Sequence, residues 1–540
     1  MYKFKLIKIL LLFFGGVLFS TKVVAQFKQE STLPDFDFVK QSNVRLSSQN
    51  PTSLSYLPVD KISRATVSGV YQKGKLINYY QSDNSLKGKL EAESYYRIHP
   101  QVVMHGLVSY QYFNGENMGG SAFVDPTITP FNIVEYKDSN RGEKQKETYH
   151  LVGGISYEAN SYLKIGANID YTAINYAKRK DLRHRNKVLD LEITTGLSYN
   201  LNNSLEIGAN YLYQKRVEGL YFNIYGTTDK SYASLIDYGS FVGRTEGFTN
   251  TGDGYTSGRT ERPLVDRYHG VATQIDWQVV PKVSFHNQIY FKQRTGYFGI
   301  KSSSSVVYSN HSADIIGYNG AVSINEKRNL HNISFGVEQN KLSNFENVYN
   351  ILNIEGGLSQ VEYYGDNQML DQKVVVANAS YNLFLGIDNY VPKYEFNLAA
   401  NLQQRNRTTS LYPYYRIQNL TFGTISAKAK QNIVRGKNIY TLGLGLSYTT
   451  GSGNVYNDGI YAQPSDTEKA PKTTLFNLNY EYEYLTKDRF MANPSFRYTR
   501  TLANNQSVFA QLGYSIDYAP KVHYLSQNHH TAMLSVGVGF

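Results

Sequence analysis

The stretch TAMLSVGVGF (531–540) alternates between two faces and decides the class of fold. A terminal segment of a soluble domain usually frays, whereas this one has the pattern of an ordered β-strand. An ordered final strand needs a partner, and in a closed barrel the last strand pairs with the first. One face of the predicted strand carries Ala532, Leu534, Val536, Val538 and Phe540.

Residues 1–25 predict a cleaved secretory signal peptide. Lysines precede a short apolar run, and Val23 and Ala25 stand where cleavage before Gln26 would require them. The alternative is an uncleaved anchor, but the run falls short of the ~20 residues that span a bilayer. The chain has no cysteine, which excludes a lipidated cysteine, disulfides and thiolate metal sites.

The composition beyond the signal is unusual for a soluble protein. The chain has 48 Tyr, 26 Phe and 43 Gly but one Trp, and its mean hydropathy is negative. No later apolar run reaches the length of a membrane helix, and short alternating segments typical of a membrane β-barrel remain. The net charge of +11 is too dispersed to indicate nucleic acid as a partner.

Three segments show the alternation most clearly: LKIGANIDYTA (163–173), LDLEITTGLSY (189–199) and VFAQLGYSIDY (508–518). In a β-sandwich the apolar face would be the core, and in a membrane barrel it would face lipid. Runs of ~10 to 13 residues exceed the usual globular strand of about five or six. Tyr recurs at strand ends, as at a membrane interface, and short connections alternate with long ones. These features favour the barrel.

The connections set the expected topology. Short turns are expected at 97–101, 157–162, 199–204, 279–282, 325–329 and 434–438. Long connections are expected at about 114–145, 177–186, 217–267, 295–311, 341–371, 404–416 and 450–471. The sequence predicts an all-β fold, a transmembrane antiparallel β-barrel with long extracellular loops and short periplasmic turns.

Counting crossings gives about 19, but single-chain bacterial barrels have even numbers. We therefore predict about 18 strands, with roughly 16 to 20 allowed, and place the counting error in 472–504. The expected organisation is a signal peptide (1–25), a periplasmic or luminal lead-in (26–62) and a barrel (63–540).

The terminal residues Leu534, Val536, Val538 and Phe540 also resemble the signal by which the barrel assembly machinery recognises outer-membrane barrels. The chain further resembles an uncharacterised family of Bacteroidota outer-membrane β-barrels of about this length. That resemblance implies an outer-membrane location and supplies no catalytic or binding residues. It is carried by INYYQSDNS (77–85), NMGGSAFVDP (117–126), FNIVEY (131–136), YAKRKDLRHRNK (176–187), VEGLYFNIYGTTDK (217–230) and RYHG (267–270).

The lead-in contains QNPTSLSYLP (49–58). It resembles the Asn-Pro segment ahead of the first strand of long-chain fatty-acid transporters, which implies a segment that enters the lumen; a plain periplasmic lead-in is the alternative. It is too short for the plug domain of a TonB-dependent receptor, so energised import by this chain alone is disfavoured.

Charged residues on the polar strand faces are the candidate lining of the lumen. Such a ring can hydrate a channel and set solute preference, or its charges can pair with each other or with an inward-folded loop. The predicted lumen-facing residues are Lys164, Asp170, Asp190, Glu192, Glu206, Asp276, Glu481, Glu483 and Asp517.

Two outer loops are further candidates. Loop 217–267 is rich in Tyr, Phe, Gly, Ser and Thr, which suits contact with sugars or a protein, or folding inward as a constriction. A basic run could bind lipopolysaccharide phosphates or be a solvated loop. Its cations are Lys178, Arg179, Lys180, Arg183, Arg185 and Lys187.

No catalytic or metal-binding pattern stands out, so we predict no enzyme activity, no cofactor and no metal site. A passive, porin-like solute channel is the predicted function. The alternatives are a non-conducting surface-binding or accessory barrel of a transport or secretion complex and, third, an outer-membrane hydrolase. The expected surroundings are the lipid bilayer and lipopolysaccharide.

Overall fold

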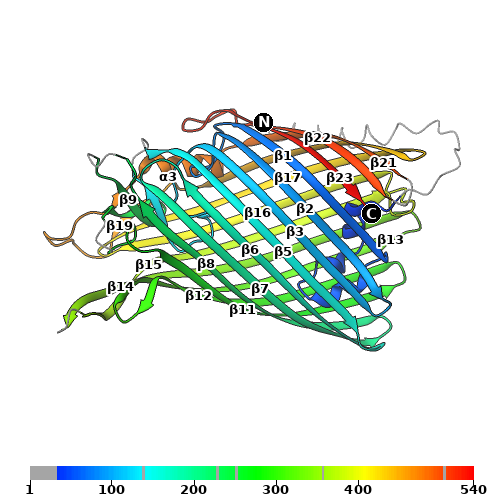
Figure 1. Ribbon diagram of the computed structural model, residues 1–540, viewed down its shortest axis with the longest axis horizontal. Coiled ribbons are helices and arrows are strands. Elements are labelled where there is room, and N and C mark those ends of the chain that lie inside the picture. The colour runs from blue at the N-terminus through cyan, green and yellow to red at the C-terminus, as the bar shows by residue number, and fades with distance from the viewer. Residues whose placement is uncertain (1–32, 137–139, 227–229, 250–252, 355–357, 503–505) are drawn as a thin grey trace.

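The computed structural model describes residues 33–136, 140–226, 230–249, 253–354, 358–502 and 506–540. The predicted signal peptide lies outside these residues. Within them, 18 antiparallel strands form one closed barrel (Figure 1), which confirms the predicted fold class. The barrel strands are β1 (Lys61–Gly74), β2 (Asn84–His99), β3 (Val102–Met118), β5 (Gly142–Glu158), β6 (Leu163–Lys178), β7 (Arg183–Asn202), β8 (Leu205–Asn223), β11 (Arg262–Val280), β12 (Val283–Ser302), β13 (Ser305–Asn325), β14 (Asn329–Ile354), β15 (Leu358–Leu385), β16 (Tyr394–Leu411), β17 (Tyr414–Arg435), β18 (Asn438–Gly453), β21 (Arg489–Thr501), β22 (Ser507–Tyr518) and β23 (Asn528–Gly539).

The first and last strands close the barrel. Val67 of β1 lies opposite Val536 of β23, and Ser63 exchanges backbone hydrogen bonds of 2.9 and 3.0 Å with Phe540. The terminal strand therefore has a partner on each side, β1 and β22, and no free edge remains there.

Alternation along each strand separates an outer from an inner face. On β11, Val271 and Trp277 are 55% and 50% exposed, whereas Gln274 and Asp276 between them are buried. The apolar outward face is the one that a bilayer would cover, and the polar face lines the lumen.

The two ends of the barrel differ. The short turns, the carboxyl terminus and residues 33–60 (the amino-terminal segment) lie at the right-hand end in Figure 1, here called the inner end. The amino-terminal segment contains α2 (Phe36–Gln41) and the 3-10 turns η1 (Val44–Ser47) and η2 (Pro51–Tyr56). By the rule that periplasmic turns are short, the opposite end faces outward.

The outer end carries a second, four-stranded sheet in the order β20-β10-β9-β4, and a helix, α3 (Leu475–Thr486). The strands are β4 (Asn132–Glu135), β9 (Ala233–Gly239), β10 (Val242–Gly247) and β20 (Lys472–Thr473). We call this sheet, α3 and the residues between β9 and β11 the outer plug. A short strand, β19 (Asn457–Ile460), pairs with the outer part of β17.

Several predicted long loops are wrong in extent. Residues 295–311 and 341–371 are mostly strand, because β12 to β15 continue beyond the rim as hairpins, of which β14 and β15 project farthest (Figure 1). The extension of β12 and β13 packs Phe298, Val306 and Tyr308 against the outer plug, so its apolar residues do not show the alternation that marks a membrane crossing.

The miscounted crossing lies where we placed it. LFNLNYEYEYLT alternates like a strand but forms α3, because its partners lie on two faces of a helix inside the outer plug. No helix of the described residues is long and apolar enough to cross a membrane.

Candidate functional site: the barrel lumen

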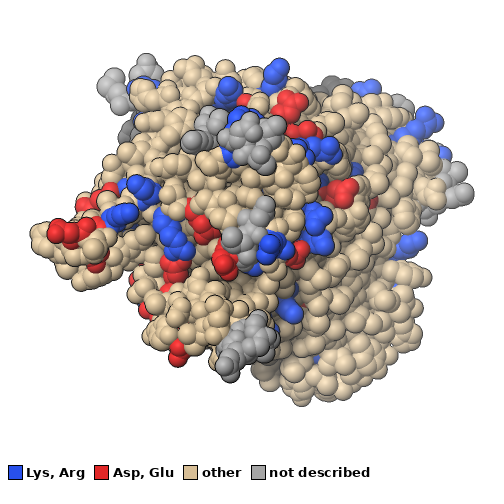
Figure 2. Space-filling model, turned by 60° about the vertical axis from the view of Figure 1, so that its left-hand side comes forward, with Lys and Arg blue, Asp and Glu red and all other residues tan. Residues whose placement is uncertain are grey.

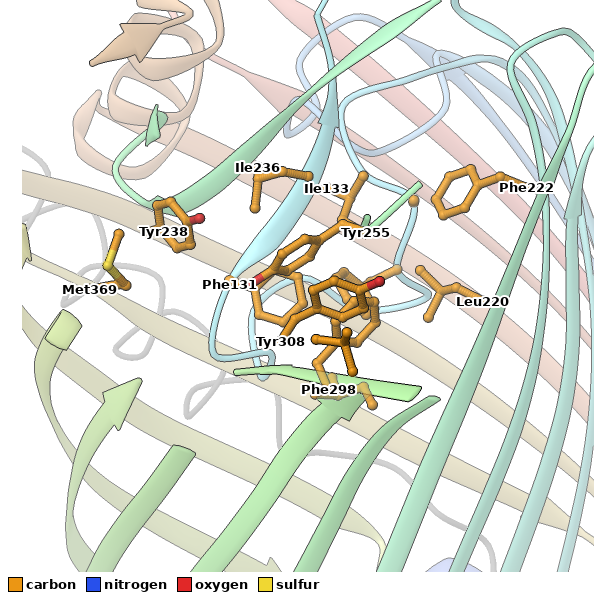
Figure 3. Packing of buried hydrophobic residues seen from close by; sticks show 14 of the residues in the cluster. Phe131, Ile133, Leu220, Phe222, Ile236, Tyr238, Tyr255, Phe298, Tyr308 and Met369 are labelled. Carbon is orange, nitrogen blue, oxygen red and sulfur yellow. The ribbon is translucent and has the colours of Figure 1, made fainter. Parts of the chain in front are cut away.

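Aromatic packing fixes the outer plug to the barrel wall. The ring of Phe131, beside β4, lies 5.3 Å from Tyr255 of the plug and 5.0 Å from Phe298 of β12, centroid to centroid (Figure 3). Tyr255 also stacks on Phe298 at 5.1 Å. Since Ile236, Tyr238 and Tyr255 are completely buried, loop 217–267 follows its inward-folded alternative.

Polar contacts join the plug to wall strands around the lumen. Tyr238 and Tyr255 donate hydrogen bonds of 2.8 and 3.1 Å to the carboxylate of Glu346 on β14. Two strands farther along the wall, Arg405 of β16 forms a 3.1 Å ion pair with Glu481 of α3. Glu483 of α3 accepts backbone N–H bonds from residues 523–525 of the last outer loop. Glu481 and Glu483 therefore lie on a plug helix, and their predicted place on a wall strand is wrong.

A cavity of about 460 Å³ lies between the outer plug and the wall. Pockets of ~300 to 1,000 Å³ commonly hold small molecules. Its charged lining residues are Asp237, Arg294, Glu338, Arg405, Arg407 and Glu481, and its rings are Tyr79, Tyr80, Phe131, Tyr238, Phe241, Tyr268, Phe422 and Tyr484.

The three arginines of this cavity differ in their partners. Arg294 pairs with Asp266 at 2.8 Å and Arg405 with Glu481 at 3.1 Å. Arg407 donates from Nε to the amide oxygen of Gln372 at 2.8 Å. Among the described residues, Arg407 has no carboxylate within ion-pair distance, so its terminal nitrogens can bind an anionic group.

A smaller cavity of about 240 Å³ is lined by wall strands β1, β2, β3, β5, β6 and β23 and by the loops that follow β1 and β3. Tyr80 lines both cavities.

Asp237 of β9 gives the outer plug a pH-dependent stability. Burial raises the pKa of this carboxyl to about 6, and nearby Arg407 offsets only part of that rise. An unfolded Asp titrates near ~4, so the docked strand is favoured by protonation and loses that stability as pH rises through the folded pKa. We expect Asp237→Asn to raise the melting temperature clearly at about pH 8 and little at about pH 4.

The exposed loop variant Asp466→Asn is the control, since its carboxyl is not buried. Equal shifts of the melting temperature for Asp237→Asn at both pH values would show that Asp237 does not cause the pH-dependent stability of the plug.

The inner end is crossed by the amino-terminal segment, which contacts wall strands on all sides. Asp37 pairs with Arg64 of β1 at 2.7 Å, and the Phe38 ring meets Phe384 of β15 at 5.0 Å. Further contacts join Lys40 to Glu93, Gln41 to Asn332, Arg45 to Asp276, Gln49 to Gln288, and Thr52 to Ser156. This end of the lumen is spanned by the segment.

Asn50 anchors that segment to the wall through buried hydrogen bonds. Its buried side-chain amide donates to the carbonyl of Leu197 at 2.9 Å and to Gln274 at 3.1 Å, and its oxygen accepts from the Thr52 N–H at 3.1 Å. Gly196 of β7 permits this close approach, because a Cβ at this position would lie 2.1 Å from Asn50 Oδ1.

We expect Gly196→Ala to push Asn50 from this position. Overpacking a tight contact costs ~1–3 kcal/mol, which would raise the population of the released segment by about fivefold or more. Trypsin cleavage within residues 33–60 of the folded protein measures that population. Gly106→Ala is the matched control, since its Cβ would meet nothing within 4 Å. Equal cleavage rates would contradict the role of this contact.

The predicted lumen residues on strands fall into two groups. Three contact the amino-terminal segment: Lys164 binds Tyr56 and Glu206 at 2.9 Å each, Glu206 also contacts Tyr56, and Asp276 binds Arg45 at 3.1 Å. The others face neighbouring wall strands. Asp170 contacts His150 at 2.9 Å, and Asp190 accepts a hydrogen bond from Gln214 at 2.8 Å. In the sheet register, Glu192 lies opposite Asp170 and Asp517 lies opposite His529.

The basic run divides between the two faces of the wall. Lys178 is buried and paired with Glu135 of β4, so its predicted contact with lipopolysaccharide is wrong. Arg183 pairs with Asp181 at 3.0 Å, and Arg179 donates to Gln145 at 2.6 Å. Three cations of β7, Arg183, Arg185 and Lys187, occupy outward positions, and Lys180 lies in the exposed turn.

Sequence reasoning missed Asn50, Asp237, Arg405 and Arg407 as site residues. For the two arginines, the available signal was their spacing, two positions apart on one strand face. For Asn50 the signal was the Asn-Pro pair in QNPTSLSYLP, which implied a segment that enters the lumen but identified no partner.

A family of unknown function (DUF6850) matches residues 51–540. The chain belongs to this family. The DUF6850 match covers the barrel and begins at Pro51, inside the segment held by the Asn50 contacts. Among curated proteins, none matches the sequence.

Solved structures similar to this DUF6850 chain are outer-membrane proteins. The ferric preacinetobactin receptor BauA from Acinetobacter baumannii has 10% identity and a TM-score of 0.39, over 88% of this chain and 80% of that one. The toluene transporter TodX from Pseudomonas putida has 11% identity and a TM-score of 0.30, over 95% and 99%. A FadL homologue from Pseudomonas aeruginosa has 10% identity and a TM-score of 0.28, over 91% and 92%. At these scores the likeness carries no argument about substrate.

Within the described residues, no group of three or more His, Asp or Glu side chains could hold a metal ion. The predictions of no enzyme activity and no cofactor stay predictions.

Proposed function

We propose that the protein is a gated, passive transporter of small solutes across the outer membrane. The cavity of about 460 Å³ between the outer plug and the wall carries this proposal. It lies inside a barrel of 18 strands, a size wide enough for an aqueous channel once the luminal parts move.

The lining of the cavity suggests the class of solute. Tyr and Phe rings offer apolar surface, and Arg407 offers a guanidinium without a carboxylate partner among the described residues. A small aromatic or apolar body with one carboxylate matches both features.

Gating follows from the two closures in series. Charged and aromatic contacts hold the outer plug, and the amino-terminal segment spans the inner end. Passage requires both to leave the wall, which adds gating to the passive, porin-like channel that the sequence favoured.

Uptake of radiolabelled benzoate by liposomes containing the purified protein tests this function. Benzoate uptake above protein-free liposomes is expected, with a loss of about tenfold for Arg407→Gln, one charge-assisted contact being worth ~1.5–3 kcal/mol. Lys469→Gln, in an exposed outer loop, is the control. Absence of uptake by folded wild-type protein would overturn the proposal.

An accessory role has one observation in its favour. The β14–β15 hairpin projects beyond the outer rim and exposes Ile351, Leu352, Tyr363 and Tyr364, the last at 62%. Exposed aromatics on a projecting hairpin suit contact with a partner protein of a transport or secretion complex. Replacing Tyr363 and Tyr364 by Ser should leave benzoate uptake unchanged if their role is only such contact.

A further inference from the structure

The outward face of β7, β8 and β11 is apolar over most of its height. Exposed Leu189, Tyr211 and Val271 point away from the lumen, and these three strands are neighbours in the wall (Figure 1). Nearer the outer end, each of the three strands carries at least one cation at an outward position.

The cations form two groups at different positions along the strands. Lys215 of β8 lies directly opposite Arg267 of β11, and both occupy outward positions. On β7 the outward series above Leu189 continues with Lys187 and Arg185, both exposed. Lys187 lies opposite Gly219 of β8, four positions farther along that strand than Lys215, which is about 13 Å at ~3.3 Å per residue. Residues far apart in sequence thus form a cationic patch of two groups, Lys215 with Arg267 and Arg185 with Lys187.

The height of the patch matches a membrane surface. Trp277 marks the inner edge of the apolar band on β11, and Arg267 lies about ten residues farther along the strand. At ~3.3 Å per residue and a tilt of about 40°, that distance is about 25 Å, the height of a barrel's apolar band. Arg267 therefore reaches the outer headgroup region.

The wall does not neutralise these charges. Among the described residues, Lys187, Lys215 and Arg267 form no ion pair within 4.0 Å, and like charges directly opposite in a sheet repel. The outward Lys341 of β14 differs in having an acidic neighbour, Asp314 of β13, although Lys373 of β15 lies opposite it on the other side. The unbalanced side of the barrel needs an anion from outside the protein.

Aromatic residues lie just beneath the cations. The Tyr211 hydroxyl and His269 Nδ1 lie 2.7 Å apart, the Tyr213 ring lies 5.3 Å from His269, and Arg185 stands 5.4 Å from the Tyr221 ring. Such rings favour the boundary between acyl chains and headgroups. The combination of an apolar wall, ring belt and unpaired cations has the layout of a phosphorylated lipid's binding site.

We propose that this patch binds the phosphorylated disaccharide headgroup of an outer-leaflet glycolipid, lipid A, with Lys215 and Arg267 at one phosphate and Arg185 and Lys187 at the other. Two separated cation groups match a headgroup that carries a phosphate at each end. The proposal rests on the outer-membrane location but not on transport.

Native mass spectrometry of the full, purified protein tests it, with added lipid A as the probe. Lys215→Gln combined with Arg267→Gln should weaken lipid A binding at least tenfold, and Lys341→Gln should leave it unchanged. Dephosphorylated lipid A should bind wild type at least tenfold more weakly than lipid A.

Unchanged binding in the double variant would overturn the proposal, as would equal binding of lipid A and phosphatidylglycerol, since the latter carries one phosphate and no disaccharide. The heat-dependent shift of folded barrels on electrophoresis confirms that each variant is folded, and Arg185→Gln with Lys187→Gln gives a second, independent loss of binding.

Discussion

Removing the amino-terminal segment together with β9 and β10 of the outer plug will turn the protein into a steadily conducting channel. The variant lacks residues 26–58 and carries a short Gly/Ser linker in place of residues 225–260. It keeps every barrel strand but loses the amino-terminal segment and β9 and β10. A barrel of this strand number is then wide enough for hydrated ions. In planar bilayers we expect stable single-channel currents from it and closed traces from wild type.

The two single deletions are the matched controls. Because the closures act in series, each single deletion should give only brief openings. Steady wild-type currents as large as those of the double deletion would contradict the gated account, and so would a silent double deletion that is shown to be folded.

Neutralising Glu481 will release the plug helix. Burial alone would raise the pKa of this carboxyl, but Arg405 and Arg407 outweigh it and hold the pKa below the usual range, so Glu481 is charged at neutral pH. Removing one partner of a buried ion pair leaves the other charge uncompensated and costs ~3–5 kcal/mol. Glu481→Gln should therefore increase protease cleavage between β18 and β21 by about a hundredfold or more.

Glu468→Gln serves as the control, since Glu468 lies on the exposed part of the same loop. If cleavage of Glu481→Gln matched that control, the ion pair with Arg405 would not hold α3.

The barrel was predictable because each crossing carries its own period-two pattern. Segments 163–173, 189–199 and 508–518 lie within β6, β7 and β22, and the strand number of 18 is confirmed. The pattern failed at 475–486, where alternation is compatible with a strand but tertiary partners select a helix.

The lumen was less predictable, because its contacts join residues remote in sequence. Arg405 and Glu481 are 76 positions apart, and Asn50 lies 147 positions from Leu197. Sequence periodicity assigns a residue to a face but carries no information about which luminal segment meets it. The candidate wall residues could thus be chosen by face, whereas the outer plug and its cavity required the three-dimensional arrangement.

The most direct test of gating locks one closure reversibly. The natural chain has no cysteine, so Asn50→Cys with Gly196→Cys introduces a single thiol pair. The Cβ built at Gly196 lies 2.8 Å from Asn50 Cγ, which puts the two Cβ atoms within the ~4.5 Å that a disulfide spans. We expect benzoate uptake by liposomes to stop when the pair is oxidised and to return on reduction. Equal uptake in both states would show that solutes do not pass the amino-terminal segment, and would contradict the account.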